Sequence, residues 1–329
     1  MISEVSILVP IYNASNYIEK CIHSLFQQTF LNIEYVFVND GSLDDSISKL
    51  RMLIEQYPQK KENIKIIELD RNRGVSFARK TAIEHSCGKY LIFIDADDYI
   101  ELNMIELLYA KIEETSADVA VCDMINEYTD HSTVVYEDFV SDNKDENFHN
   151  MLLGKKTISV LWNKLIKREL YELEECQLPE YLNSLEDSHV IIRIYYNAVK
   201  IVKVNEVLYH YVHSNPNSIT KTIERVHFEN LLLFWKLLDQ FITEKNIKNY
   251  TSFIEYLKVK DKIQLMIAAK FFQFSREYAW IFHDFEMKYI HKFRKGEKIM
   301  LFLLHYKFFF FAQLFHKALR YKNRKYRSK

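Results

Sequence analysis

Glycine and proline are scarce in this chain of 329 residues, which contains five glycines and four prolines. Together they make up under 3% of the chain, against about 12% in average proteins, so collagen-like, linker-like and proline-rich disordered sequences are excluded. The glycines are also too far apart to build Gly-x-Gly-x-x-Gly, Gly-x-x-x-x-Gly-Lys-[Ser/Thr] or Gly-x-Ser-x-Gly. The sequence therefore lacks the glycine-rich phosphate loops of dinucleotide-binding and P-loop proteins, and the nucleophile turn of α/β-hydrolases.

Cysteine is also sparse. The chain has four cysteines, none in a Cys-x-x-Cys pair, at positions 21, 87, 122 and 176. This spacing argues against a thiolate zinc site. The opening MISEVSILVPIYN has no basic segment followed by a long apolar one. We therefore expect a cytosolic protein with reduced thiols.

Strand-like and helix-like patterns alternate through the first 125 residues. Apolar, β-branched runs predict strands at VSILVP, EYVFVN, IKIIEL, YLIFID and DVAVCDM. Helical patterns lie between them at ASNYIEKCIHSLFQQ, LDDSISKLRMLIEQY, SFARKTAIEHSC and ELNMIELLYAKIEE. This order predicts a mostly parallel α/β sheet with helices on both faces, and ligands bound beyond the carboxyl ends of its strands.

Polar residues follow the first four predicted strands directly, as PIYN, NDGS, DRNRG and DADD. The carboxylates of Asp95 and Asp97 come straight after a buried strand, where they suit a hard divalent cation that can in turn hold a diphosphate. The alternative is that these acids cap the next helix, and Asp98 with Glu101 fits that capping pattern.

The remainder of the chain changes character. Residues 126–150 turn polar and predict a loop or excursion, whereas SLEDSHVIIRIYYN predicts a helix. Residues 222–295 have the pattern of long helices without strands. A smaller helical C-terminal domain follows from this pattern.

The end of the chain is strongly basic, although the formal net charge is only −1. Residues 287–329 hold 13 Lys/Arg and one acid, which gives about +12 beside a body of about −13. The longest uncharged stretches of this tail are 8 and 9 residues, too short for the roughly 18 that span a bilayer. At helical spacing, one arc of the tail is polar and mostly basic: Lys298, His305, Gln313, His316, Lys317, Arg320 and Arg324. Phe302 and Phe309 are exceptions on this arc, and Lys307 lies opposite it.

We expect this tail to lie on an anionic membrane surface, because basic residues beside an aromatic face are typical of interfacial helices. The alternative is a helix packed on the body with a solvated basic end. Nucleic-acid binding has no other motif to support it.

Four motifs, taken in order, carry a resemblance to a known family. SILVPIYNASNYIEKCIHSLFQQTFLNIEYVFVNDGSLDDS followed by RNRGVSFARKTAIEHSCGKYLIFIDADD resembles glycosyltransferase family 2, the inverting sugar-nucleotide transferases with a GT-A fold. The resemblance is close over residues 4–125. It is looser over 155–220, through LWNKLIKREL, SLEDSHV and LYHYVHSNPNSIT.

The resemblance implies a GT-A fold, with a Rossmann-like nucleotide-binding, mostly parallel sheet, and a helical C-terminal region. The implied catalytic domain covers residues 1–221, with a nucleotide-sugar-binding half at 1–125 and an acceptor-side half at 126–221. A helical domain at 222–295 and the membrane-associating tail at 296–329 would follow.

By the same resemblance, the loops after the first two strands hold the nucleoside of a UDP-sugar. Tyr12 and Asp40 would contact the base, with Pro10 and Asn13 beside them. An aromatic ring can stack on a base and a carboxylate can accept its imide N–H, which agrees with this assignment. The alternatives are a core position for Tyr12 and an Asx turn with Gly41 for Asp40.

The Asp-x-Asp motif and two arginines complete the implied donor site. Asp97 would be the ligand of Mn²⁺ or Mg²⁺, and Asp95 a second ligand or ribose contact, with Ala96 between them. Arg79, and less directly Arg73, would lie near the nucleotide; the alternative for Arg79 is a solvated helix face.

On the acceptor side, Glu186 and Asp187 resemble the family's Glu-Asp pair, whose second acid deprotonates the acceptor hydroxyl. Taken alone, these acids read as an ordinary helix start with Ser184 as its N-cap. Lys164 is a further candidate for substrate contact.

One position departs from the family pattern. Relatives commonly have an arginine in the stretch that corresponds here to residues 211–213, before Ser218 and Ile219. His213 would make a weaker, pH-dependent diphosphate clamp in its place. The alternative for His213 is a loop histidine that contacts only solvent or backbone.

These expectations combine into one functional hypothesis. The chain would be an inverting hexosyltransferase that moves a sugar from a UDP-sugar to a saccharide, which we expect to be lipid-linked, in bacterial surface-polysaccharide synthesis, at the inner face of the cytoplasmic membrane. A sugar-phosphate nucleotidyltransferase is disfavoured because no Gly-Gly occurs. A catalytically inactive sugar-nucleotide-binding or scaffolding subunit is the other alternative; Asp95, Asp97 and Asp187 argue against it, whereas the missing arginine near His213 leaves room for it.

Overall fold

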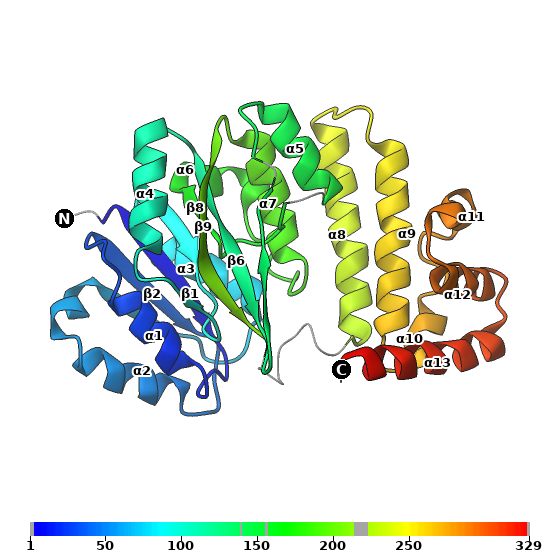
Figure 1. The fold of residues 1–329 in the computed structure, drawn as a ribbon, viewed down its shortest axis with the longest axis horizontal. Helices are drawn as coiled ribbons and strands as arrows, with labels where there is room; N and C mark the ends of the chain where they lie inside the picture. The colour runs from blue at the N-terminus through cyan, green and yellow to red at the C-terminus, as the bar shows by residue number, and fades with distance from the viewer. Residues whose placement is uncertain (1–2, 139, 155–156, 214–222, 328–329) are drawn as a thin grey trace. The chain divides into compact units, whose positions relative to one another are not determined.

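The chain folds into two compact units, residues 1–215 and 216–329. The computed structural model describes residues 3–138, 140–154, 157–213 and 223–327 (Figure 1). The predicted boundary between residues 221 and 222, together with Ser218 and Ile219, lies outside the described residues.

The first unit is built on one sheet with the strand order β3-β2-β1-β4-β8-β6-β9-β5, and β7 pairs with β6. Its strands are β1 (Val5–Ile11), β2 (Ile33–Asn39), β3 (Ile64–Glu68), β4 (Tyr90–Phe93), β5 (Tyr99–Ile100), β6 (Val119–Glu127), β7 (Ser132–Val135), β8 (Lys164–Lys167) and β9 (Ile201–Val212). Strands β1 to β4 are parallel, as predicted. The other half is mixed, because β8 runs antiparallel to both β4 and β6 while β9 runs parallel to β6.

Helices cover both faces of this sheet (Figure 1). They are α1 (Ile18–Phe26), α2 (Ser46–Glu55), α3 (Val75–His85), α4 (Met104–Thr115), α5 (Lys144–Leu153), α6 (Arg168–Glu172) and α7 (Glu186–Asn197). The helices predicted between the strands, and the one predicted in SLEDSHVIIRIYYN, are confirmed. Residues 126–150, expected to be a loop or excursion, contain β7 and most of α5.

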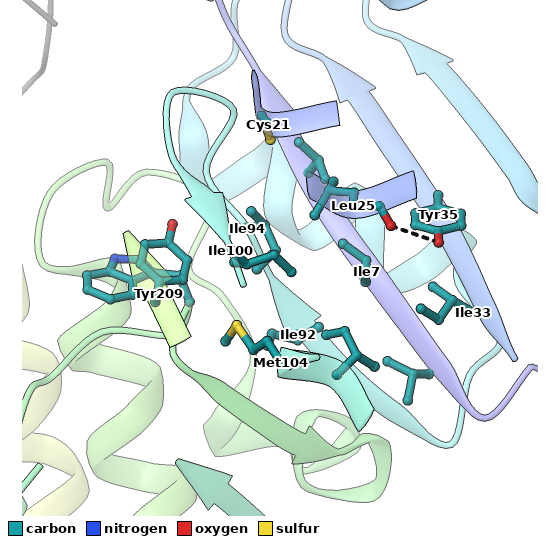
Figure 2. Packing of buried hydrophobic residues seen from close by; sticks show 14 of the residues in the cluster. Ile7, Cys21, Leu25, Ile33, Tyr35, Ile92, Ile94, Ile100, Met104 and Tyr209 are labelled. Atoms are coloured by element: carbon teal, nitrogen blue, oxygen red, sulfur yellow. Dashed lines mark hydrogen bonds between the residues drawn. The ribbon is translucent and has the colours of Figure 1, made fainter. Parts of the chain in front are cut away.

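Strand β1 shows why the parallel strands read as continuous apolar runs. Successive side chains point to opposite faces of a strand, and both faces of β1 are buried. Ile7, on one face, belongs to a core shared with Cys21 and Leu25 of α1 (Figure 2). Tyr35 of β2 joins the same core, and its hydroxyl donates to the Leu25 carbonyl at 3.1 Å. Helix α3 packs on the other face of β1 and β2.

The second unit is helical, as predicted, and its described residues contain no named strand. Its helices are α8 (Arg225–Glu244), α9 (Thr251–Ala268), α10 (Phe272–Glu277), α11 (His283–Tyr289), α12 (Lys295–His305) and α13 (Phe309–Arg327). Both α12 and α13 pack against α9. None of the described helices combines the length and the apolar character needed to cross a bilayer.

The basic tail differs from the single amphipathic helix expected from its sequence. It is divided between α12 and α13, and Lys307 between them has a φ of 60°. The sequence pattern placed His316 on the polar arc, but this residue is buried. The centres of the His316 and Phe272 rings are 5.7 Å apart. Met300, Leu301 and Leu304 of α12 are buried.

Candidate active site at the carboxyl edge of the parallel strands

The loops after β1 and β2 are tied together at one edge of the sheet. The Asn13 amide donates to Ser42 Oγ at 3.1 Å, and the Leu43 amide donates back to Asn13 Oδ1 at 2.9 Å. Pro10, at the end of β1, is half-buried. Tyr12 is 48% exposed beside these loops, so the core alternative for this residue is wrong. Its ring is available for a flat ligand.

Asp40 ties the loop after β2 to the loop after β3. It is buried, and its two oxygens accept the backbone amides of Arg73 at 2.6 Å and Gly74 at 2.9 Å. Burial raises the pKa of Asp40, and these two hydrogen bonds oppose that shift. The Asx turn considered for Asp40 is made by Asn39, whose Oδ1 accepts the Ser42 amide at 2.9 Å.

Gly41 lets these loops approach each other. Its φ is +67°, and a Cβ at this position would lie 2.6 Å from the Arg71 carbonyl carbon and from the Asn72 amide nitrogen. Any other residue would be strained and would push the third loop away. Arg73 in that loop is exposed, and its guanidinium lies 3.2 Å from the centre of the Phe77 ring.

Arg79 of α3 is the centre of the site. Its guanidinium is buried and pairs with three carboxylates: Glu186 Oε1 at 2.7 Å, Asp95 Oδ1 at 3.0 Å, and Asp187 through a short contact to Oδ1. The solvated-face alternative for Arg79 is therefore wrong. Arg79 joins the end of β4 to the first turn of α7. Its three partners lie 16, 107 and 108 positions away from it in the sequence. We call Arg79, Asp95, Glu186 and Asp187 the arginine cluster.

The arginine cluster carries one positive and three negative formal charges. Burial raises the pKa of Glu186, and the Asp187 charge adds to that effect. Burial likewise raises the pKa of Asp187, which Arg79 opposes. The three carboxylates in turn raise the pKa of Arg79, although its burial acts in the opposite direction. The excess of negative charge makes the cluster a place where a proton or another cation is favoured.

The Asp-x-Asp motif begins at this cluster. The Asp95 side chain is 25% exposed, Ala96 is buried and Asp97 is half-buried. Asp98 is not a helix cap, because the chain continues into β5 and α4 begins only at Met104, after Asn103. Its carboxylate instead accepts the Tyr209 hydroxyl at 2.7 Å and the Val212 amide at 2.8 Å.

Asp95 and Asp97 are the candidate ligands for a divalent cation. Burial raises the pKa of Asp98 most, and the charges of Asp97 and Asp95 raise it further, so the three carboxylates repel one another. Oxygen ligands of this kind suit Mn²⁺ and Mg²⁺, whose remaining positions are usually filled by phosphate and water. Asp95 and Asp97 are the two that reach the surface.

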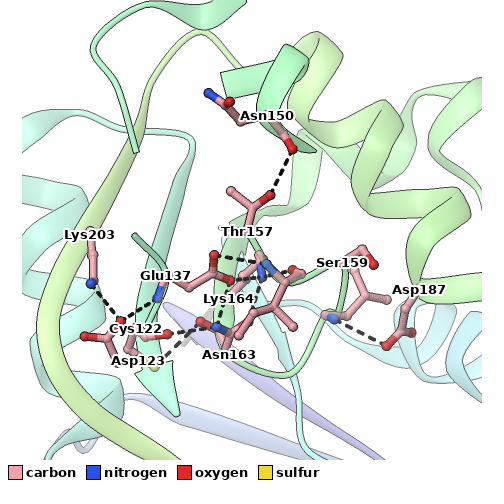
Figure 3. A network of polar contacts seen from close by, with 12 residues as sticks. Cys122, Asp123, Glu137, Asn150, Thr157, Ser159, Asn163, Lys164, Asp187 and Lys203 are labelled. Carbon is pink, nitrogen blue, oxygen red and sulfur yellow. Dashed lines mark hydrogen bonds and ion pairs between the residues drawn. The ribbon is translucent and has the colours of Figure 1, made fainter. Parts of the chain in front are cut away.

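Asp187 has a second set of neighbours on its other side. Its Oδ2 receives the Leu161 amide at 3.4 Å, and the next residue, Ser188, donates to Ser159 Oγ at 3.0 Å. The positive φ of Leu185, 71°, turns the chain into α7, and no side-chain cap from Ser184 precedes it. The segment 157–163 therefore fixes the carboxylate from behind (Figure 3).

Lys164 corrects an expectation. Its side chain is fully buried, and its ammonium donates to Glu137 Oε1 at 2.9 Å, the Ile158 carbonyl at 2.8 Å and Asn163 Oδ1 at 2.7 Å (Figure 3). An ammonium has three hydrogens. All three are used, so Lys164 has none left for a substrate and supports the 157–163 segment instead.

His213, at the end of β9, makes side-chain contacts that exclude the loop-histidine alternative. Its ring stacks on Tyr128 with centres 4.2 Å apart, and its Nε2 lies 3.0 Å from Asn126 Oδ1. Tyr211 meets the same ring edge-on at 4.7 Å. The aromatic pair fixes the ring orientation of His213.

The structure thus brings the predicted residues together in groups. Arg79, Asp95, Glu186 and Asp187 are in direct contact, and Asn13, Asp40 and Arg73 organise the adjoining loops. Sequence reasoning missed Tyr209 and Glu137, whose roles depend on partners 111 and 27 residues away. The valine-rich and tyrosine-rich stretches of β9, IVKV and VLYHYV, were the available signal for Tyr209.

The chain is similar to known proteins in sequence and in fold. The model of the glycosyl transferase family 2 matches residues 6–173. The uncharacterised glycosyltransferase EpsJ of Bacillus subtilis is 33% identical over 67% of this chain, and the match spans 64% of EpsJ, under two thirds of its length. The putative glycosyltransferase EpsH of the same organism is 32% identical over 74% of this chain and 70% of EpsH.

Among solved structures, residues 1–349 of Staphylococcus aureus TarS in complex with UDP-GlcNAc superpose with a TM-score of 0.71 at 18% identity. The superposition covers 97% of this chain and 92% of that one. At this identity the likeness concerns the fold alone. It confirms the expected GT-A-like α/β architecture with a helical C-terminal region.

Proposed function

We propose, from the premise that this chain belongs to glycosyl transferase family 2, that it transfers a sugar with inversion from a nucleotide-sugar, most simply a UDP-sugar, to a saccharide acceptor. The observation that carries the proposal is the arginine cluster: the buried carboxylate of Glu186 and the half-buried one of Asp187, both on α7, are held against the Asp-x-Asp strand end by Arg79. It lies next to loops with an exposed aromatic ring. TarS, which shares the fold, was solved with UDP-GlcNAc.

Asp187 is the proposed general base. A base must be unprotonated, yet basic enough to take a hydroxyl proton, and a carboxylate with a raised pKa meets both needs once the pH is above that pKa. The proton of the acceptor hydroxyl passes to Asp187 while the acceptor oxygen bonds to the anomeric carbon. The bond from that carbon to the diphosphate oxygen breaks on the opposite face, and its electron pair leaves with the diphosphate. Arg79 holds Oδ1, and Oδ2, which accepts the Leu161 amide at 3.4 Å, has a second lone pair for the acceptor hydroxyl.

The donor is proposed to lie across the first three loops. Tyr12 can stack on the base, and Asp40 can orient it through a carboxylate that the amides of Arg73 and Gly74 already fix. Asp97 and Asp95 would hold Mn²⁺ or Mg²⁺, which supplies charge neutralisation for a diphosphate. His213, in place of an arginine, would reach the diphosphate from the end of β9.

A membrane location is proposed for the reaction, with a lipid-linked saccharide as the acceptor. Hydrophobic side chains are exposed along the tail at Ile299, Phe302, Tyr306, Phe308, Phe310, Phe311 and Leu314. Residues 287–329 carry 13 of the 44 Lys/Arg of the chain. Aromatic groups that enter the headgroup region and basic residues that attract anionic lipid reinforce each other.

The membrane proposal is tested by co-sedimentation with vesicles that contain anionic lipid. Phe310→Ser/Phe311→Ser should reduce the bound fraction, whereas Leu31→Ser/Leu43→Ser, which changes two exposed leucines of the first unit, should not. Salt should weaken binding of the native chain, because the screening length falls from about 10 Å at 0.1 M to about 3 Å at 1 M. Equal binding by both double variants would reject this surface.

The activity is tested by UDP release from a panel of UDP-sugars with saccharide acceptors, in the presence of Mn²⁺ or Mg²⁺. Metal-dependent release by the native chain should be lost in Asp97→Asn and kept in Asp142→Asn, an exposed aspartate outside the site. Nucleotide binding without release from any donor would favour the inactive-subunit alternative instead. Release that is equal in both variants would refute Asp97 as a metal ligand.

A further inference from the structure

A buried carboxylate in the helical unit faces two imidazoles. Glu286 of α11 is fully buried, and its Oε2 lies 2.6 Å from His305 Nδ1 and 3.3 Å from His283 Nδ1. The two imidazole rings stack with centres 4.1 Å apart and an interplanar angle of 9°. Two ring nitrogens from different helices therefore converge on one oxygen.

The other oxygen of Glu286 is already neutralised. Its Oε1 pairs closely with the ammonium of Lys262, which is also fully buried. That ammonium also donates to the carbonyls of Ala279 and Ile281 at 2.5 and 2.6 Å. Lys262 thus fixes the carboxylate from behind, as hydrogen-bonded second neighbours fix the ligands of metal sites.

We propose that His283, Glu286 and His305 bind a divalent transition-metal ion, with Zn²⁺ as the best match. Within the part of the chain that the structure describes, these three form the one His/Cys/Asp/Glu group whose ligand atoms all lie within 4.8 Å of one another. Two imidazole nitrogens and one carboxylate oxygen are a common zinc ligand set. Metal–ligand bonds of about 2.0–2.2 Å place tetrahedral ligands roughly 3.3 Å apart, so small side-chain movements complete the geometry.

The three ligands leave a path from solvent by which an ion can reach the site. The His283 side chain is 42% exposed, whereas that of His305 is 17% exposed. An ion can therefore arrive from the His283 side, and water can fill the fourth position. Each imidazole would bind through Nδ1 as the neutral tautomer that keeps its proton on Nε2.

Such an ion would join the start of α11 to the end of α12. His283 is the first residue of α11 and His305 is the last residue of α12, directly before the exposed aromatic residues at 306–311. A metal that binds the folded state alone stabilises it by mass action. Because the ion would join two helices, its proposed role is structural. The site is separate from the Asp-x-Asp motif in sequence and in ligand type, so its test does not depend on transfer activity.

The test uses the full chain without a histidine tag, freed of metal by a chelator and titrated with Zn²⁺ by calorimetry. We expect one site per chain, a higher melting temperature with Zn²⁺, and a tetrahedral Co²⁺ spectrum in the visible range. His283→Asn and His305→Gln should each weaken binding by more than about 10-fold. The matched control is His291→Asn, an exposed histidine in the same unit, which should bind as the native chain does.

Two further measurements keep the outcome unambiguous. Circular dichroism without metal shows whether each variant folds, and Asp97→Asn should keep its Zn²⁺ binding because that residue belongs to the other site. Zn²⁺ affinity that is unchanged in both folded histidine variants, or a native chain that binds no Zn²⁺, would overturn the proposal and leave a hydrogen-bonded His–Glu–His cluster.

Discussion

Two buried charge networks of the first unit differ in balance and in access to solvent. The Lys164–Glu137 pair matches one positive charge with one negative charge, and both side chains are fully buried. The arginine cluster sets one positive charge against three negative ones, and Asp95 and Asp187 keep 25% and 16% of their side chains exposed. The Lys164–Glu137 pair, which we call the closed pair, is therefore neutral, whereas the arginine cluster has a net negative formal charge.

This difference separates a network that supports the fold from one that can take part in chemistry. A buried pair that is balanced and fully hydrogen-bonded gains nothing from a ligand, and its loss leaves an unpaired charge in the core. Carboxylates in excess, with raised pKa values, are typical of sites that accept protons or cations. The two networks meet at segment 157–163, because Lys164 holds the Ile158 carbonyl and the Leu161 amide reaches Asp187.

The largest effect is expected from Asp187→Asn. Removing a general base lowers turnover by roughly 10² to 10⁴-fold, because the acceptor proton has no place to go. Steady-state kinetics of UDP release should show this loss in kcat, while donor affinity measured by calorimetry stays near that of the native chain. Asp142→Asn is the control. A native turnover rate for Asp187→Asn would move the base to Glu186.

Breaking the Lys164–Glu137 pair should lower the stability of the folded chain. Lys164→Met leaves Glu137 buried without its cation, which should cost about 3–5 kcal/mol of the free energy of unfolding. Denaturant melts measure this cost. Lys164→Met/Glu137→Gln should recover part of it, since neither residue is then charged. A double variant no more stable than the single one would mean that the pair does not act through charge balance.

The excess charge of the arginine cluster predicts a pH dependence with opposite signs for activity and stability. Burial raises the pKa of Asp187 in the folded chain, so the base is unprotonated only above the ordinary aspartate range, and kcat/KM should rise with pH there. The folded pKa lies above the unfolded one. The linked stability is therefore complete below about pH 4 and is lost as pH rises through the folded pKa.

Asp95→Asn sharpens this test. The Asp95 charge is one of the causes that raise the pKa of Asp187. Its removal should move the acid limb of the kcat/KM profile to lower pH, even if the rate itself falls through weaker donor binding. An acid limb that stays in place would mean that Asp95 does not influence the base.

The features of the fold and of the site that could be predicted from the sequence are those whose interacting residues lie close together in the chain. Strands β1, β2 and β4 are buried on both faces, so their apolar runs were visible, and the partly exposed edge strand β3 was indicated by its isoleucines. Short motifs indicated Asp95, Asp97 and Asp187. Strand β9 was missed because polar residues such as Asn205 and Glu206 interrupt it, and its pairing with β6 and β5 defines it. The short strand β8 was missed as well.

The partners of charged residues were hidden for the same reason. Lys164 looked like a substrate contact because Glu137 lies 27 residues away in a stretch that reads as a loop. The position of Arg79 near the site was indicated by the resemblance, but its three carboxylate partners were not. In the helical unit, His283 and His305 are 22 positions apart, and no spacing pattern joins them.

The smallest effect is expected next to Arg79 on the same helix. Lys80 pairs with Glu180 at 2.9 Å, but the two side chains are 32% and 36% exposed, so water and salt screen their attraction. Lys80→Ala should leave the melting temperature and kcat within error of the native chain. By contrast, Arg79→Ala strands three carboxylates in a buried place and should lose both activity and stability. A Lys80→Ala variant as damaged as Arg79→Ala would mean that burial and charge excess are not what distinguish these neighbours, and that α3 itself is the sensitive element.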